Sequence, residues 1–339
     1  MQKSELKGHI AGIDFMRAIC ALGIIVYHFL GSSRSGIEVM HSFKNGQMGA
    51  VYVTIFFAIS GFVLYHNYAC PGNTGRYYLK RAKAIYPMFY LAYAYFFIDN
   101  AITSGDMFSH GQPWCLIFSV LGVDGYAASK FPVYAFIGEW FLGALIILYV
   151  MYPLFAGLLK KSTALTAVIM VGLYIWMMLT QYFTQYAIRN IIACALSFVF
   201  GMILAKHKDI ICDCIPAVIA SAAVALILAT VKLPMINEYI LTQLFGLSLF
   251  LPLLFIGNFV MKYDKYGIIK ELSVLSYPIF LLQHQIIGRV QSYQNPSSVS
   301  GTLFVLFLTT LLIIFCAWCL KTVSDKLMQS IFRKKSPNL

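Results

Sequence analysis

The sequence predicts an all-α polytopic membrane protein with about ten transmembrane helices and both termini in the cytoplasm. Hydrophobic residues make up 60% of the 339-residue chain and charged residues only 11%, whereas soluble domains are about a quarter charged. The apolar residues gather into runs of membrane-spanning length. We expect a single membrane domain over 1–339, with a core at about 8–325 and a basic cytoplasmic tail at 326–339.

Ten apolar runs are long enough, or nearly so, to cross a hydrocarbon layer of about 30 Å. They lie at 13–31, 47–66, 84–101, 134–157, 163–183, 190–205, 215–231, 237–258, 273–290 and 300–321. The run at 190–205 is short, and the run at 273–290 carries several polar residues, so these two are the least typical spans. Residues 114–123 form a further apolar segment, which we expect to be interfacial or re-entrant.

The loops between these runs form two alternating sets, and Lys and Arg are divided unequally between them. The set that includes both termini holds eighteen of these residues. The other set holds six: Arg34, Lys44, Lys130, Arg189, Lys232 and Arg289. Because basic loops remain in the cytoplasm, this asymmetry predicts cytoplasmic termini. Topology and anionic lipid then explain the net charge of +12, and we expect no nucleic-acid partner.

The first run, IDFMRAICALGIIVYHFLG at 13–31, carries three ionisable side chains within the expected membrane span. Arg17 and His28 differ by roughly 20° in helical phase and by roughly 16 Å along the axis, and Asp14 lies within about 60° of both. Ionisable groups in a spanning helix cost a few kcal/mol each, which favours a functional role. The structural alternative is that Asp14 and Arg17 neutralise one another and His28 packs between helices.

Between the second and third runs, residues 67–84 are expected to form a basic cytoplasmic loop. Its cations are Arg76, Lys80, Arg81 and Lys83. Arg binds phosphate through paired hydrogen bonds and Lys acts as a point charge, so this cluster suits an anionic ligand. The alternative is an anchor for the inner membrane edge.

The longest connection on the non-cytoplasmic side, at 102–133, is rich in Gly, Ser, Asp and aromatic residues, including Trp114 and Tyr126. Aromatic faces and carboxylates suit a carbohydrate, so a sugar platform is one interpretation. An interfacial aromatic belt is the other.

Two later polar residues are expected near the depth of His28. Glu139 lies near the outer end of the fourth run, and His284 lies in the outer half of the ninth. A carboxylate or second imidazole beside His28 would orient the ring and raise its basicity. For Glu139 the alternative is solvation at the membrane interface.

The eight cysteines sit mostly in apolar runs or expected cytoplasmic loops, as is typical of small apolar residues and free thiols. Cys316 and Cys319 form a C-x-x-C motif inside the last run, with no His nearby. We therefore expect no disulfide, no bound metal and no resident cofactor. The sequence also lacks a G-x-S-x-G elbow, a P-loop and a G-x-G-x-x-G loop.

Five segments together resemble the integral-membrane acyltransferase 3 family. The family's first helix resembles DFMRAICALGIIVYHF at 14–29, and its second-helix signature resembles FFAISGFVL at 56–64. Its basic segment and third helix resemble KRAKAIYP at 80–87. Two later motifs resemble WFL at 140–142 and SYPIFLLQH at 276–284.

The resemblance implies a bacterial-type O-acyltransferase of the plasma membrane. Its donor would be cytoplasmic acyl-coenzyme A, with acetyl as the expected acyl group, and its acceptor a hydroxyl of a cell-surface or cell-wall glycan or a lipid-linked sugar. His28 would act as general base or as a transient acyl carrier.

The resemblance also implies that Lys80, Arg81 and Lys83 hold the donor. Because Arg17 shares a helix face with His28, we expect it to hold a phosphate or the pantetheine end of the donor, with Asp14 holding the Arg17 side chain. Many family members carry R-x-x-R before I-Y-P, whereas position 84 here is Ala. The family's basic role therefore transfers best to Arg81.

Intramembrane Arg, Asp and His also mark proton relays and substrate paths, so a transporter or flippase of a glycan or small polar substrate is the alternative function. The sequence shows no inverted repeat of interrupted helices, which disfavours it. An inactive scaffold of a cell-wall assembly is a third interpretation.

Overall fold

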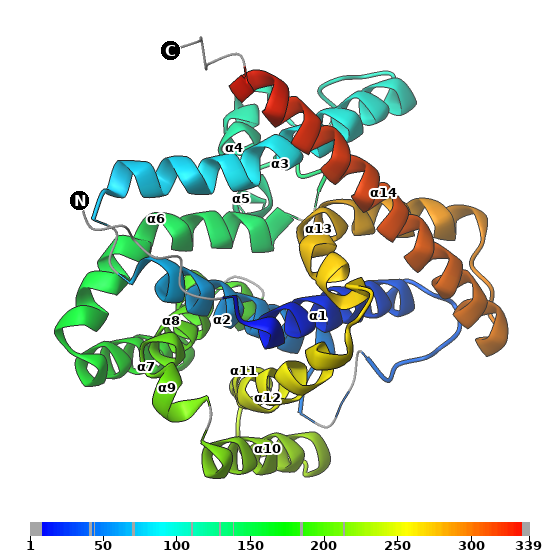
Figure 1. The fold of residues 1–339 in the computed structure, drawn as a ribbon. Coiled ribbons are helices and arrows are strands. Elements are labelled where there is room, and N and C mark those ends of the chain that lie inside the picture. Colours follow the sequence, from blue (N-terminus) through cyan, green and yellow to red (C-terminus); the bar gives the residue numbers. More distant parts are fainter. Residues whose placement is uncertain are drawn as a thin grey trace. The chain divides into compact units, whose positions relative to one another are not determined.

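The computed structural model describes residues 9–40, 43, 45–69, 72–109, 111–128, 130–137, 139–183, 186–212 and 214–333. Most of these residues are helical, and the only β pairing among them is an isolated bridge between Phe43 and Gly46. The α-helices (Figure 1) are α1 (Ala11–Gly31), α2 (Met48–Tyr68), α3 (Thr74–Ser104), α4 (Leu116–Leu121), α5 (Asp124–Ala127), α6 (Glu139–Lys161), α7 (Thr163–Thr180), α8 (Ile191–Lys206), α9 (Lys208–Ile211), α10 (Ile215–Thr230), α11 (Glu238–Ser248), α12 (Phe250–Val260), α13 (Ile268–Tyr293) and α14 (Val299–Arg333). Short 3₁₀ turns are η1 (Pro113–Cys115), η2 (Ala187–Arg189) and η3 (Met261–Tyr263).

Each of the ten predicted apolar runs overlaps helix in the structure, although residues 134–137 of the run at 134–157 precede α6 and are not helical. Six helical segments of the described chain combine the length and hydropathy of a membrane span, namely α1, α2, α6, α7, α14 and the stretch from α11 through η3. The apolar helices α8 and α10 are shorter. The chain is thus an all-helical, multi-pass membrane protein, while ten crossings and cytoplasmic termini stay predictions.

The expected basic loop at 67–84 is mostly helix, which corrects the prediction. Helix α2 continues to Tyr68 and α3 already begins at Thr74. Gly72 and Asn73, which disfavour a helix, lie in the short gap before α3, and the residues that follow are compatible with a helix. All four cations of the cluster therefore lie on the first turns of α3.

The predicted run at 237–258 is two helices rather than one. The break falls between α11 and α12, because Pro252 has no N–H to donate to the carbonyl of Ser248. The Ser221 hydroxyl on α10 donates to that carbonyl instead, at 2.6 Å. A side chain from another helix thus satisfies the group that the proline leaves without a partner.

The last helix is longer than predicted. Helix α14 runs to Arg333, so the expected basic tail from 326 begins as helix, and residues 334–339 lie outside the described part. The helix formers Lys326, Leu327 and Met328 continue the pattern of the preceding turns.

The helices form two compact units that interleave along the sequence. Unit 1 comprises Met1–Gly31, Ile37–Thr74 and Ile147–Val274. Unit 2 comprises Ser32–Gly36, Gly75–Ile146 and Leu275–Leu339. Neither unit is a continuous stretch of chain.

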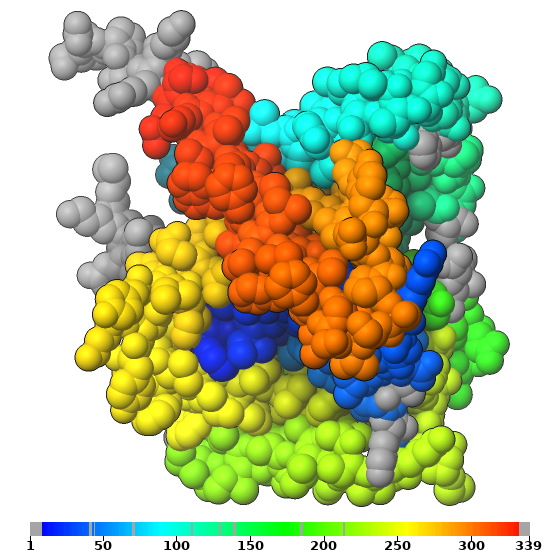
Figure 2. All heavy atoms as spheres, turned by 90° about the vertical axis from the view of Figure 1, so that its right-hand side faces the viewer, coloured from blue at the N-terminus to red at the C-terminus, as the bar shows by residue number. Residues whose placement is uncertain are grey.

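In unit 1, α1 and α2 pack with α8, α10, α11 and α12 around a shared apolar core that includes Met16, Ile55, Phe62 and Phe250. Helices α2 and α8 approach closely, since a Cβ at Gly61 would overlap the Phe198 carbonyl. Small residues permit such close helix packing in membranes. Figure 2 shows the first turns of α1, in dark blue, lying against α12, in yellow.

In unit 2, three tyrosines on one side of α3 hold the short helix α4. Tyr86 and Tyr90 donate to the carbonyls of Leu121 and Val120 at 2.9 and 2.6 Å, and Tyr93 donates to the Ser119 hydroxyl at 2.8 Å. The predicted interfacial segment at 114–123 is therefore a structured element fixed to α3.

Candidate functional site

Arg17 and His28 lie on one unbroken helix, α1, in unit 1. The predicted helical phase therefore holds, and both side chains occupy the same face about three turns apart. Each is half-buried, whereas Asp14, one turn before Arg17, is 6% exposed. The helix thus carries an anion, a cation and a titratable ring along one stripe.

The buried Asp14 has two contacts that sequence reasoning missed. His9 Nε2 lies 2.6 Å from Asp14 Oδ2, and the Ser273 hydroxyl donates to Asp14 Oδ1 at 2.7 Å. Ser273 is 259 residues away in the chain, so no local pattern signals it. The carboxylate ties the start of α1 to the first turns of α13, and its role in holding Arg17 stays a prediction.

The turn that carries His28 is fixed to the start of α2. The neighbouring Tyr27 hydroxyl donates to Gln47 Oε1 at 2.9 Å, and a Cβ at Gly49 would overlap the Tyr27 ring. The rings of Tyr27 and His28 are 5.1 Å apart between centroids and meet edge to face. His28 is therefore held in place while its ring stays partly accessible, as a proton acceptor requires.

In unit 2, the helical geometry of α3 separates the four cations of the basic cluster. Arg81 is half-buried with a buried Nε atom, and it shares a face with the buried residues Tyr77, Ile85 and Phe89. Together these four residues recur at four-residue spacing. The other three cations, Arg76, Lys80 and Lys83, are exposed. Arg81 is thus the cation of this cluster that the packed face of α3 orients.

Two of the segments that carry the family resemblance meet within unit 2. Tyr277 of the SYPIFLLQH segment donates from its hydroxyl to the carbonyl of Ile85, in the IYP segment, at 3.1 Å. This bond joins α13 to α3 close to Arg81. His284 lies two turns further along α13 and is exposed.

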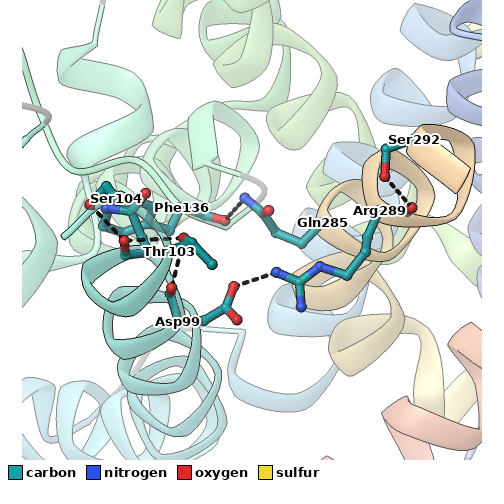
Figure 3. Close-up of polar contacts among 8 residues, drawn as sticks. Asp99, Thr103, Ser104, Phe136, Gln285, Arg289 and Ser292 are labelled. Atoms are coloured by element: carbon teal, nitrogen blue, oxygen red, sulfur yellow. Dashed lines mark hydrogen bonds and ion pairs between the residues drawn. The ribbon is translucent and has the colours of Figure 1, made fainter.

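The turns of α13 around His284 are anchored by polar contacts (Figure 3). Gln285 Nε2 donates to the carbonyl of Phe136 at 2.6 Å, and the Arg289 guanidinium forms an ion pair with Asp99 near the end of α3. The Ser292 hydroxyl donates to the Arg289 carbonyl at 2.7 Å. These contacts set the rotation of α13 at the position that carries His284.

Glu139 is the first residue of α6, and its side chain lies outside the described part. Arg17 and His28 belong to unit 1, whereas Lys80, Arg81, Lys83, Glu139 and His284 belong to unit 2. The geometry of each set is therefore defined within its own unit. The expected cluster of Glu139 and His284 around His28 stays a prediction.

Unit 2 contains a buried carboxyl, Asp124, which sequence reasoning also missed. It lies at the start of α5, is 1% exposed and accepts from the Gly125 N–H at 2.9 Å. Its second oxygen, Oδ2, is buried without a hydrogen-bond partner. Burial raises the pKa of Asp124 to about 6, and the Gly125 N–H and the nearby Ser119 hydroxyl partly offset this rise.

Among the residues that the structure describes, no group of three or more His, Cys, Asp and Glu side chains is arranged to hold a metal ion. The family model described as an acyltransferase domain matches residues 10–321, which is nearly the whole chain. No curated protein and no solved structure matches the chain.

Proposed function

The chain belongs to the acyltransferase 3 family of membrane acyltransferases, and we propose that it transfers an acyl group, specifically acetyl, from cytoplasmic acyl-coenzyme A to a glycan hydroxyl at the cell surface or in the cell wall. The proposed location is the bacterial plasma membrane. The observation that carries this proposal is α1, which presents Arg17 and His28 on one face of an unbroken, membrane-length helix. A reaction between a donor and an acceptor on opposite sides of the membrane needs functional groups at two depths in the membrane.

His28 is the proposed general base. Its ring nitrogen takes the proton of the acceptor hydroxyl as the hydroxyl oxygen attacks the thioester carbonyl carbon. The carbon–sulfur bond then breaks, and the coenzyme A thiolate leaves and takes up the proton. Imidazole is the side chain that most readily takes up and releases a proton near neutral pH. In the alternative route, the His28 nitrogen accepts the acyl group first and passes it to the hydroxyl.

The donor is proposed to bind through Arg81 and Arg17. Arg81 lies half-buried on the packed face of α3. A guanidinium forms paired hydrogen bonds with phosphate, so this is the cation proposed to hold the polyphosphate. Arg17 lies about three turns before His28 on α1 and would contact the pantetheine arm or a phosphate. Lys80 and Lys83, both exposed, would add positive charge for the polyphosphate.

Replacing His28 tests this mechanism directly. We expect His28→Gln and His28→Ala to lower acyl transfer by about 10²- to 10⁴-fold, because neither side chain accepts a proton at neutral pH. The measurements are acyl ester on the glycan and release of coenzyme A by the purified protein, with thermal stability as the control for folding. Near-normal transfer by His28→Gln would show that His28 is structural. Movement of a glycan across vesicles by the wild type without coenzyme A release would favour the transporter instead.

A further inference from the structure

Beside His28, one end of unit 1 carries a cluster of aromatic and cationic side chains from separate parts of the chain. The Arg189 guanidinium lies over the Tyr186 ring, 5.1 Å from its centroid, and within electrostatic range of the Tyr27 phenol. Tyr27 donates to Gln47, and Tyr186 is in turn near Tyr239 on α11. We call Tyr27, Gln47, Tyr186 and Arg189 the Arg189 cluster.

The described residues on either side of Tyr186 and Arg189 are anchored to neighbouring elements. Asn190 donates from its amide to the Tyr182 carbonyl at 2.6 Å, and its Oδ1 accepts from the Ile192 N–H at 2.9 Å, which caps α8. Phe183 packs edge to face on Tyr239 at 5.8 Å between ring centroids. A fixed segment loses little entropy when a ligand binds, which is the usual condition for a recognition surface.

The cluster is open and positively charged. Tyr186 is 46% exposed, and Arg189 and Gln47 are exposed as well. Arg189 is one of only six cations in the predicted non-cytoplasmic loops, and Lys232 of the same set is also exposed. Lys232 follows Val231, whose carbonyl accepts from Asn45 near Gln47 at 2.7 Å.

Positive charge is disfavoured in non-cytoplasmic loops, on which the predicted topology places Arg189. Its guanidinium lies over the exposed Tyr186 ring and within electrostatic range of Tyr27, the neighbour of His28, which makes this position a candidate for binding an acidic ligand. An aromatic face packs against the C–H groups of a pyranose ring, and the Gln47 amide supplies hydrogen-bond donors and an acceptor for hydroxyls. A guanidinium pairs with a carboxylate or a phosphate.

We propose that the Arg189 cluster is an acceptor subsite for a glycan that bears an acidic group, carboxylate or phosphate, and that it presents a nearby hydroxyl to His28. This proposal rests on the proposed function and names the acceptor class. Tyr186 stacks on the sugar ring, Arg189 pairs with the acidic group, and Gln47 binds a hydroxyl.

Binding of three hexasaccharides to the purified full chain tests the subsite. The probes are oligogalacturonate, phosphorylated maltohexaose and neutral maltohexaose. We expect the wild type to bind at least one acidic hexamer about tenfold or more tightly than the neutral one at low salt, because a charged hydrogen bond is worth that factor. Arg189→Gln should abolish the preference, Tyr186→Ala should weaken all binding, and Tyr186→Phe should bind normally.

The matched control is Lys130→Gln, which removes an exposed cation of the same predicted side from unit 2 and should leave every affinity unchanged. No acidic preference in the wild type, or a preference that survives in Arg189→Gln, would overturn the subsite. If Arg189→Gln lost bound phosphatidylglycerol but kept every glycan affinity, the subsite would also be overturned, since Arg189 would then bind lipid.

Acyl transfer to the same probes separates this proposal from the proposed function. An Arg189-dependent preference in binding, without acyl ester on any glycan, would support the subsite and contradict the proposed reaction. Equal transfer to acidic and neutral hexamers by both the wild type and Arg189→Gln would support the reaction and contradict the subsite.

Discussion

At the scale of single residues, Asp124 shows how burial changes the chemistry of a side chain. Its carboxyl is enclosed at the start of α5, next to Ser119 and within electrostatic range of Tyr93, with one oxygen lacking a partner. A buried carboxyl prefers its neutral form, so the pKa rises from 3.8 to about 6. Folding therefore favours the protonated state of Asp124 relative to the unfolded chain.

The sign of the pH dependence follows from this shift. Because the folded pKa is raised, the stabilising contribution of Asp124 is complete below about pH 3.8 and is lost as pH rises through about 6, by about 3 kcal/mol at most. We expect hydrogen exchange at 116–127, corrected for intrinsic rates, to be slower at pH 5 than at pH 7.5. Asp124→Asn should remove the difference, since an amide does not titrate. An unchanged pH response in this variant would assign the effect to another group.

At the scale of elements, α3 turns a basic stretch of sequence into a surface with two sides. The spacing of Tyr77, Arg81, Ile85 and Phe89 places Arg81 on the packed face and leaves Lys80 and Lys83 exposed. The helix therefore gives Arg81 a more buried environment than Lys80 and Lys83 have.

Replacing these cations singly tests that difference. We expect Arg81→Ala to raise the apparent KM for acyl-coenzyme A by about 10- to 100-fold, the value of a charged hydrogen bond, with little effect on acceptor affinity. Lys80→Ala and Lys83→Ala should change it less than Arg81→Ala does, because exposed charges are screened. Initial rates at varied donor concentration give the apparent KM for acyl-coenzyme A, and initial rates at varied acceptor concentration give the effect on the acceptor. An unchanged affinity in Arg81→Ala would remove this residue from the donor site.

The contact between α2 and α8 supplies a second test at this scale. A Cβ at Gly201 would overlap the Ala58 carbonyl, so Gly201→Ala forces two backbones apart. We expect a loss of about 1–3 kcal/mol or more in the free energy of unfolding, seen as a lower thermal midpoint in detergent. Gly172→Ala on α7 is the matched control, since a Cβ there meets nothing within 4 Å and alanine favours a helix. Equal midpoints for the two variants would contradict the close packing.

At the scale of the whole molecule, the sequence predicts ten crossings, whereas six helical segments of the described chain have both the length and the hydropathy of a span. Helices α3 and α13 fall outside this set. Helix α3 carries many tyrosines together with Asp99 and Asn100, and α13 carries charged and amide side chains such as Glu271, Gln285 and Arg289. Orientation therefore requires a direct experiment.

Single-cysteine labelling of a cysteine-free variant in intact cells measures orientation. An impermeant maleimide should label a cysteine at position 128 and should not label one at 78 or 264 until the cells are opened, because basic loops stay inside. The reverse pattern would contradict the predicted topology. Labelling of all three positions in intact cells would contradict the alternation of the loops.

The sequence by itself determined the helical class, the ten apolar runs and the stripe of Arg17 and His28 on α1. These features depend on local composition and on the period of one helix, which neighbouring residues are sufficient to set. It also indicated the family, because five short motifs occur in order and the family model spans 10–321.

Only the tertiary structure decided which partners these residues have. Asp14 binds Ser273, Ser221 satisfies the carbonyl freed by Pro252, and Tyr277 reaches α3, each across a long stretch of chain. Such contacts arise when distant segments bury their apolar surfaces together and the enclosed polar groups must find partners. No local pattern in a single sequence encodes that pairing, which is why the burial of Asp124 and the Arg189 cluster became visible only in the folded chain.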